Sequence, residues 1–250
     1  MDIPSTRILG VRVDRVDLHQ TLHIIDEFIA ARTTHQIVVV NAAKIVKAIQ
    51  DRQLKAIIEQ ADLSGADGMP VVWASKLFGK SIPGRVNGTD LMEALVLKAQ
   101  QKNYRIFFLG ARQEVVKKVV SMYKSFFPAL QIAGYHHGYF SKEEERQVAQ
   151  KIGDSNADIL FVAFGTPKKE KFISAYKEIM RVPVIHGVGG SFDVVAGITK
   201  RAPLWMQKSG LEWFYRFLQE PRRMWKRYLV TNTLFIFYIL LALLHLKKFD

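Results

Sequence analysis

One carboxylate, Asp67, is the best candidate in this chain for acid–base chemistry. It follows a short apolar run, and its surroundings read Gly65-Ala66-Asp67-Gly68, so the backbone or a substrate can approach it closely. A carboxylate in such a turn can take the proton from an attacking hydroxyl group. The alternative is a structural role, because an aspartate at this distance can also cap the helix that is predicted to begin at Pro70.

Five predicted strand ends could bind a diphosphate group. Each leads into a helix, where free backbone N–H groups and the positive end of the helix dipole favour an anion. Because the carboxyl ends of parallel strands meet at one edge of a sheet, we expect these turns to form a common site. None is a P-loop or a complete dinucleotide fingerprint, so ordinary turns are the alternative. The strand ends are Asn41 and residues 65–68, 110–111, 165–167 and 187–190.

Four arginines could hold phosphate oxygens in a bidentate manner, or they could be solvated surface charges: Arg85, Arg201, Arg216 and Arg223. Arg216 and Arg223 are seven residues apart, which would place them on one helical face unless Pro221 breaks the helix. Asp193 could hydrogen-bond a ribose or a base, or it could cap a helix. The histidines form no HExxH or His-x-His pair, so no metal site is predicted.

Predicted strands alternate with predicted helices along the chain. Strands are expected at residues 7–13, 36–40, 62–64, 104–109, 130–135, 159–164 and 182–186. Helices are expected at residues 17–31, 41–59, 70–78, 88–101 and 112–126, and from the 165–167 turn to Ile179. A further helix is expected after Ser141, which would cap it with Glu144 as the capping-box partner. This order is typical of a Rossmann-like α/β fold, with a mainly parallel sheet and helices on both faces.

The composition limits the class of protein. A hydrophobic fraction of 49% with 11% aromatic residues excludes a disordered chain. The net charge of +13 favours anionic partners such as nucleic acid, phospholipid or a phosphorylated substrate. Cysteine is absent, which excludes disulfides and thiolate metal sites. The N-terminus lacks the pattern of a signal peptide, so we expect the bulk of the chain to stay in the cytoplasm.

Residues 200–250 differ from the α/β core that is predicted for residues 1–199. Residues 200–227 carry eight Lys/Arg against two acids and include three tryptophans, whereas residues 229–246 contain no Asp, Glu, Lys or Arg. A helix of that second stretch would be about 27 Å long, slightly short of a hydrocarbon core of about 30 Å. We therefore expect a helical appendage that lies in or dips into a membrane leaflet, with a true span as the alternative.

Taken in order, these segments resemble the WecG/TagA/CpsF family of bacterial glycosyltransferases, which is glycosyltransferase family 26. The resemblance covers residues 7 to 228, and it depends on the ordered set of motifs rather than on any one of them. The motifs are Asn41-Ala42, Ala66-Asp67-Gly68-Met69, Pro83-Gly84-Arg85-Val86-Asn87-Gly88-Thr89-Asp90, Phe107-Phe108-Leu109-Gly110, His137-Gly138-Tyr139-Phe140, Phe164-Gly165-Thr166-Pro167-Lys168-Lys169-Glu170, Gly187-Val188-Gly189-Gly190-Ser191-Phe192-Asp193, Ala196-Gly197, Lys200-Arg201-Ala202-Pro203-Leu204-Trp205, Gly210-Leu211-Glu212-Trp213-Phe214-Tyr215-Arg216 and Glu220-Pro221-Arg222-Arg223.

The resemblance implies an inverting enzyme that moves a sugar from a UDP-sugar to an undecaprenyl-diphosphate-linked acceptor. The product would belong to an exopolysaccharide, a capsule or a teichoic acid. No cofactor is implied, since the UDP-sugar is the donor substrate. The resemblance also implies a peripheral or C-terminally anchored protein at the cytoplasmic face of the bacterial inner membrane, where the appendage meets an anionic surface. A homo-oligomer is left open, and nucleic acid is not an expected partner.

The same resemblance implies roles for particular residues. Asp67 matches the catalytic base, and Arg85 matches a residue at the substrate diphosphate. Arg216 and Arg223 match appendage arginines that reach the active site or the lipid diphosphate. The other residues expected to bind substrate are Asn41, Asn87, Gly110, Gly165, Pro167, Lys169, Glu170, Gly189, Gly190, Asp193 and Arg201.

Two positions depart from the family pattern. Val39 stands where many members have Thr, and Lys169 stands where the common motif has Gln. Both are expected near the donor or acceptor pocket. The donor sugar is therefore not carried over from members that use N-acetylmannosamine or its uronic acid, and the acceptor sugar and linkage are left open as well.

Three other classes of protein fit parts of the sequence. A nucleic-acid-binding protein would explain the positive charge, but no helix-turn-helix, RNP-like aromatic strand pair or zinc-finger spacing is present. An NAD-dependent dehydrogenase would need a complete glycine fingerprint and an acid about 20 residues later, and neither occurs. A non-catalytic membrane scaffold would need only the basic and apolar C-terminus, and a sugar-transfer assay separates it from an enzyme.

Overall fold

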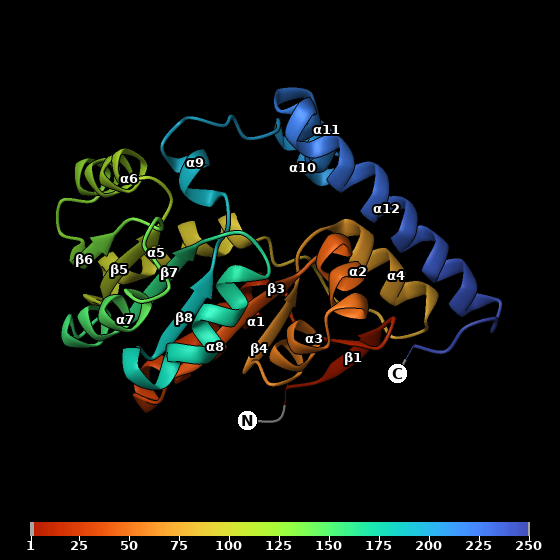
Figure 1. The fold of residues 1–250 in the computed structure, drawn as a ribbon, viewed down its shortest axis with the longest axis horizontal. Helices are drawn as coiled ribbons and strands as arrows, with labels where there is room; N and C mark the ends of the chain where they lie inside the picture. Colours follow the sequence, from red (N-terminus) through yellow and green to blue (C-terminus); the bar gives the residue numbers. More distant parts are fainter. Residues whose placement is uncertain (1–2, 250) are drawn as a thin grey trace.

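The computed structural model describes residues 3–249, apart from the side chains of Lys208, Arg223, Met224, Lys226, Arg227 and Tyr228. Its centre is a sheet of six parallel strands in the order β4-β3-β8-β7-β5-β6 (Figure 1). The strands are β3 (His35–Val40), β4 (Leu63–Ala66), β5 (Arg105–Gly110), β6 (Gln131–His136), β7 (Ile159–Ala163) and β8 (Val184–Gly187). The predicted Rossmann-like α/β fold is thus confirmed, and every strand predicted from residue 36 onward has its counterpart.

Helices cover both faces of the sheet because the inner strands are apolar on both sides. All five residues of β7 are buried, and successive side chains enter different hydrophobic clusters. Phe161 lies in the cluster formed with α1 (Leu18–Ala31), α5 (Gly88–Lys102), α6 (Gln113–Phe126) and α9 (Ser191–Val195). Leu160 lies on the opposite face, in the cluster formed with α7 (Glu145–Asp154) and α8 (Lys168–Met180). The remaining helices of that face, α2 (Ala42–Gln50), α3 (Arg52–Glu59) and α4 (Met69–Leu77), cover the β3–β4 end.

The N-terminal segment is a hairpin rather than the single strand predicted at residues 7–13. β1 (Ser5–Ile8) and β2 (Val11–Asp14) pair antiparallel, and the turn between them is left-handed at Leu9 and Gly10, with φ of 51° and 74°. The prediction was wrong because apolar residues run through the turn without a polar break. The buried carboxylate of Asp14 fixes the hairpin to the sheet by accepting the N–H of Ser64 in β4 at 2.7 Å.

The start of α1 is as predicted, because Asp17 accepts the N–H of Gln20 at 2.8 Å and the Gln20 side chain completes the capping box. Two other helix predictions were wrong. The helix predicted at residues 41–59 is divided into α2 and α3, since Asp51 ends the first and caps the second by accepting the N–H of Leu54 at 3.0 Å. α7 begins at Glu145, later than predicted, and no side chain caps it, although Glu144 accepts the N–H of Ser141 at 2.6 Å as in the predicted capping box.

Three helices follow the core: α10 (Leu204–Lys208), α11 (Glu212–Gln219) and α12 (Pro221–Leu243). Pro221 begins a new helix, so Arg216 and Arg223 lie on different helices and the single arginine-bearing face is not formed. α12 lies beside α2 (Figure 1), and its Phe235 and Ile239 are buried in the cluster that contains α2. Within residues 3–249, no helix is both long enough and apolar enough to cross a bilayer.

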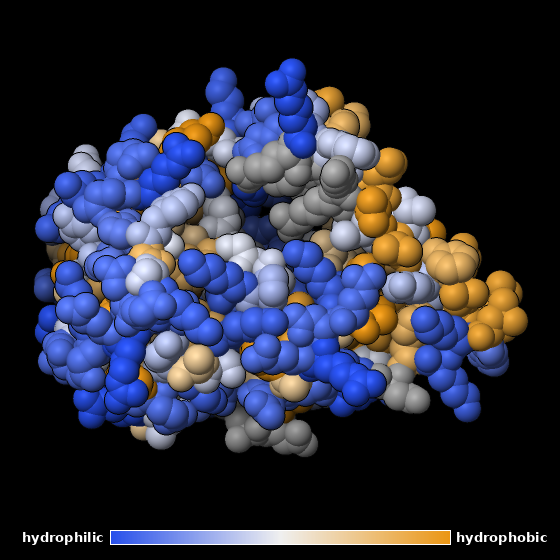
Figure 2. All heavy atoms as spheres, viewed as in Figure 1, coloured by the Kyte–Doolittle hydropathy of each residue, from blue (hydrophilic) through white to orange (hydrophobic). Residues whose placement is uncertain are grey.

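The side of α12 that turns away from α2 is exposed and mostly apolar. Figure 2 shows hydrophobic residues gathered along this helix. The apolar face of α12 is defined by five side chains that are at least half exposed: Leu229, Val230, Ile236, Phe237 and Leu240. The helix therefore has one face packed on protein and another face open.

Candidate active site

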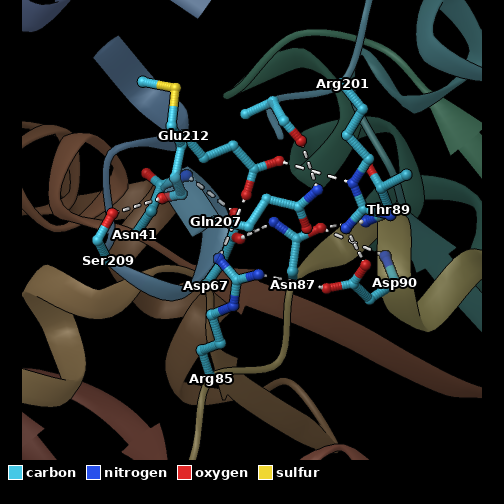
Figure 3. A network of polar contacts seen from close by, with 12 residues as sticks. Asn41, Asp67, Arg85, Asn87, Thr89, Asp90, Arg201, Gln207, Ser209 and Glu212 are labelled. Carbon is cyan, nitrogen blue, oxygen red and sulfur yellow. Dashed lines mark hydrogen bonds and ion pairs between the residues drawn. The ribbon is translucent and has the colours of Figure 1, made fainter. Parts of the chain in front are cut away.

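Asp67 follows β4, at the edge of the sheet where Asn41 follows β3 (Figure 3). Its backbone N–H donates to the carbonyl oxygen of Val40 at 2.8 Å, which continues the strand pairing. Two amides bind its carboxylate: Nδ2 of Asn41 donates to Oδ2 and Nδ2 of Asn87 donates to Oδ1, both at 3.2 Å. The Asp67 side chain does not cap α4, whose N-terminus has no side-chain cap. The structural alternative for Asp67 is therefore wrong.

The two asparagines are oriented by the helices that they begin. Oδ1 of Asn41 accepts the N–H of Lys44 at 3.0 Å, and Oδ1 of Asn87 accepts the N–H of Thr89 at 2.9 Å. Because each amide oxygen serves a helix terminus, the NH₂ group of each side chain is left to face Asp67. A carboxylate that is held in this way has a fixed direction in which it can accept a proton from a hydroxyl group.

An arginine–carboxylate network, formed by Arg85, Asp90, Arg201 and Glu212, lies beside Asp67 (Figure 3). The guanidinium of Arg85 lies 3.3 Å from Oε2 of Glu212 and 3.7 Å from Oδ2 of Asp90. Arg201 forms an ion pair with the same Asp90, and its Nε lies 3.9 Å from Oε1 of Glu212. The four side chains are 19% to 29% exposed, so water reaches all of them. Because Asp90 lies in α5 and Glu212 begins α11, the network joins the core to the C-terminal helices.

The carboxylates of this network were missed by the sequence analysis, which identified only Arg85 and Arg201. Burial raises the pKa of Glu212, Asp67 and Asp90 raise it further, and the two arginines oppose this effect. The two predicted arginines could have indicated these carboxylates, because two half-buried guanidinium groups need carboxylates nearby. Asp90 and Glu212 both lie inside the motifs that indicated the site.

A second charged group, the buried lysine–glutamate cluster, consists of Lys44, Lys169 and Glu170. Nζ of Lys44 lies 2.7 Å from Oε1 of Glu170, and Nζ of Lys169 lies 3.5 Å from the same oxygen. The three side chains are 4%, 10% and 1% exposed, respectively. Lys169 and Glu170 were predicted at the site and lie in the first turn of α8, whereas Lys44, from the first turn of α2, was missed.

Burial sets the protonation of this region. It lowers the pKa of Lys169 to about 8, with help from the charge of Lys44. It would raise the pKa of Glu170, but the two ammonium groups outweigh it and bring that pKa to about 2. His186, which is fully buried in β8, has its pKa lowered by burial to about 4, and its Nε2 lies 3.2 Å from the carbonyl oxygen of Gly88. At neutral pH the cluster is therefore charged and His186 is neutral.

The glycines of the 187–190 turn allow two cations to approach it. A Cβ on Gly187 would lie 2.8 Å from Cδ of Lys169, and a Cβ on Gly189 would lie 3.6 Å from Nζ of the same lysine. From the other side, a Cβ on Gly190 would lie 2.5 Å from Nη2 of Arg216 in α11. Nε of Arg216 has no hydrogen-bond partner among the residues that are described. The turn thus lies between a lysine of the core and an arginine of the C-terminal helices.

The other predicted site residues lie along the same carboxyl edge: Gly110 ends β5, Gly165 and Pro167 follow β7, and Asp193 is half-buried in α9. Gly110 has a φ of 126°, and a Cβ there would lie 2.8 Å from the backbone of Ala163, so only glycine fits. The side chain of Arg223 lies outside the described residues, and its role stays a prediction. In the described part of the chain, no three His, Asp or Glu side chains are grouped to hold a metal ion.

This arrangement of a parallel sheet with polar groups at its carboxyl edge agrees with what sequence comparison finds. The sequence profile of the Glycosyl transferase WecG/TagA/CpsF family matches residues 6–249. The chain belongs to this family. The predicted resemblance is confirmed, and Asp67 with its neighbours is the candidate active site of a WecG/TagA/CpsF glycosyl transferase.

Two curated proteins similar to this WecG/TagA/CpsF chain carry the name N-acetylglucosaminyldiphosphoundecaprenol N-acetyl-beta-D-mannosaminyltransferase. The one from Bacillus spizizenii (strain ATCC 23059 / NRRL B-14472 / W23) is 43% identical over 183 residues, which cover 73% of this chain and 70% of the relative. The one from Bacillus subtilis (strain 168) is 41% identical over 207 residues, which cover 83% and 78%.

Proposed function

We propose that this protein is an inverting glycosyltransferase that moves a sugar from a UDP-sugar to undecaprenyl-diphosphate-linked N-acetylglucosamine during synthesis of a bacterial cell-envelope polymer. The observation that carries the proposal is the geometry of Asp67, a carboxylate that two amides bind at the carboxyl edge of a parallel sheet, beside the arginine–carboxylate network. The names of the two relatives support the acceptor class. The donor sugar is left open because of Val39 and Lys169.

The proposed reaction is a single displacement at the anomeric carbon of the donor sugar. Asp67 takes the proton of the acceptor hydroxyl group while the hydroxyl oxygen bonds to the anomeric carbon. The bond from that carbon to the diphosphate breaks, and its electron pair leaves with UDP. One in-line displacement inverts the anomeric configuration. Two cationic side chains at the same edge, Arg85 and Arg201, stabilise the charge on the leaving UDP. We therefore propose that the reaction needs no metal cofactor.

The variant Asp67→Asn tests the assignment of the base. It keeps the size of the side chain and removes its ability to take a proton, so transfer from a UDP-sugar panel should fall by about 10²–10⁴-fold while thermal unfolding stays near that of the wild type. Asp154→Asn, an exposed aspartate on α7, is the matched control and should transfer normally. Near-wild-type turnover of Asp67→Asn would contradict the base, and a product of retained configuration by NMR would contradict the displacement.

We also propose that the protein acts at the cytoplasmic face of the bacterial inner membrane through the apolar face of α12. Exposed apolar side chains that follow a basic stretch suit an anionic lipid surface. Flotation with anionic vesicles should recover the wild type, and the double variant Ile236→Ser/Phe237→Ser should float less. Phe126→Ser, which changes an exposed apolar residue on α6, is the control. The alternative is that a second copy of the chain covers the apolar face of α12. Light scattering would reveal such a dimer by its doubled mass.

A further inference from the structure

The buried lysine–glutamate cluster holds one positive charge more than its own carboxylate can balance. Lys44 and Lys169 share Oε1 of Glu170, and Oε2 of Glu170 has no hydrogen-bond partner among the described residues. Each of the three side chains is 10% exposed or less, so water screens the excess charge poorly. A charge without a counter-ion is costly in such surroundings. The cluster is therefore a place where an additional anion would stabilise the protein.

Of the two lysines, Lys169 is the one whose ammonium group reaches the 187–190 turn. Lys44 is the nearer partner of Glu170, whereas Nζ of Lys169 lies 3.5 Å from that carboxylate and 3.1 Å from the hydroxyl oxygen of Thr166. The stem of Lys169 crosses Gly187, where a Cβ would lie 2.8 Å from Cδ, and its Nζ reaches Gly189. The two glycines thus provide the path by which a buried lysine reaches the 187–190 turn.

The position of this ammonium group relates it to the candidate base. Asp67 raises the pKa of Lys169 through its charge, so the two groups lie within electrostatic reach of each other. Arg216 approaches the next residue of the same turn, Gly190, from the side of α11. An anion at the turn would therefore meet one cation from the core and one from the C-terminal helices, close to where Asp67 would act.

We infer that the Lys169 ammonium binds an anionic oxygen of the donor at the 187–190 turn, within reach of Asp67. The inference rests on the proposed function, because it takes the donor to be a UDP-sugar. Two groups of such a donor have this chemistry. One is the diphosphate next to the anomeric carbon, and the other is a carboxylate on the transferred sugar.

Calorimetric titration of Lys169 variants tests the inference. Lys169→Met and Lys169→Gln remove the charge, and Lys168→Met does the same at the exposed neighbouring lysine as a control. Three probes are titrated: UDP, a UDP-N-acetylhexosamine and a UDP-N-acetylhexosaminuronic acid. Loss of a charge-assisted hydrogen bond should weaken binding of at least one probe by about ten- to hundredfold. Two variants are used because one of them could fold poorly, and thermal unfolding identifies such a variant.

Proton uptake on binding is a second readout. An anion that binds Lys169 raises a pKa that stands near 8, so the wild type should take up part of a proton per bound UDP-sugar at pH 8.5. Two buffers of different ionisation enthalpy measure this uptake, which Lys169→Met should lose. The pKa values of Glu170, near 2, and of His186, near 4, keep these two groups from titrating there. The other charges that act on Lys169 are those of Lys44 and Asp67. Nearby, Lys47 donates to the carbonyl oxygen of Thr166 and Arg216 approaches Gly190.

The outcomes distinguish the diphosphate from the sugar carboxylate, and the role of Lys169 from the glycosyltransferase activity itself. Equal weakening of all three probes identifies the diphosphate, and a loss confined to the uronic acid donor identifies the sugar carboxylate. Unchanged affinities together with no proton uptake by the wild type would overturn the inference and leave the glycosyltransferase proposal standing. A wild type that binds no probe and transfers no sugar would overturn the glycosyltransferase proposal itself.

Discussion

The arginine–carboxylate network and the buried lysine–glutamate cluster are built from the same kinds of charge but differ in their access to water. The side chains of the network are 19% to 29% exposed, and those of the cluster are 10% exposed or less. Ion pairs that water reaches contribute less to stability and exchange partners more easily than a fully buried pair, which is costly to break. The two groups therefore suit different tasks. The cluster fixes the start of α2 and α8, and the network can release its arginines to a diphosphate.

The variant Glu170→Gln should lower the free energy of unfolding more than any other variant of the two groups. It leaves the ammonium groups of Lys44 and Lys169 buried without a carboxylate, so the free energy of unfolding should fall by about 3–5 kcal/mol. Urea unfolding measures the change. Glu212→Gln makes the identical chemical change in the network and should cost less than about 1 kcal/mol. A similar loss of unfolding free energy in the two variants would show that burial does not distinguish the two groups.

His186 is a buried group without a charged partner among the described residues, and it should make stability depend on pH. Burial lowers its pKa from 6.5 to about 4, so its contribution to stability is complete above pH 6.5 and is lost as the pH falls from 6.5 to 4. The total is at most about 3 kcal/mol. Urea unfolding of the wild type and of His186→Gln at pH 7.5 and pH 5 should show a smaller pH dependence in the variant. Parallel pH profiles would show that another buried group is responsible.

Exchange of partners in the arginine–carboxylate network should have a small effect on the affinity for UDP. Without its charge, Glu212 no longer competes for Arg85, so Glu212→Gln should bind UDP up to about fivefold more tightly at low salt. The gain should shrink at high ionic strength, because salt screens exposed pairs. Titration of UDP at low and high salt measures both. Weaker binding by the variant would instead mean that Glu212 positions Arg85 for the ligand.

Much of the sheet and its functional edge could be predicted from the sequence, because these features follow local rules. Buried strands are short apolar runs, and parallel strands bring their carboxyl ends together. Asn41 and Asp67 were therefore predicted at the site, whereas Asn87 was expected there only through the family resemblance. The turn at Leu9 and Gly10 was missed because its left-handed backbone leaves no polar mark in the sequence.

Pairings across the fold could not be predicted in this way. Lys44 lies on a helix that is rich in alanine and other apolar residues, and only the folded chain reveals that its ammonium group meets Glu170 of α8. Glu212 looks like an ordinary surface acid until α11 lies over Arg85. The apolar composition of residues 229–246 predicted lipid contact, but it does not distinguish lipid from protein. Phe235 and Ile239 in fact pack on the core, while Ile236 and Phe237 are exposed.

The burial of Phe235 and Ile239 has a consequence for the order in which the protein forms as it is synthesised. These side chains complete the hydrophobic cluster of α2, a helix that is made far earlier in the chain. Until α12 has been made and has docked, that part of the cluster lacks its cover and presents apolar surface to its surroundings. Asn41 begins α2 and orients Asp67, so the candidate base is fully supported only late in folding. A nascent chain would thus acquire activity in one late step and would depend on protection from aggregation before it.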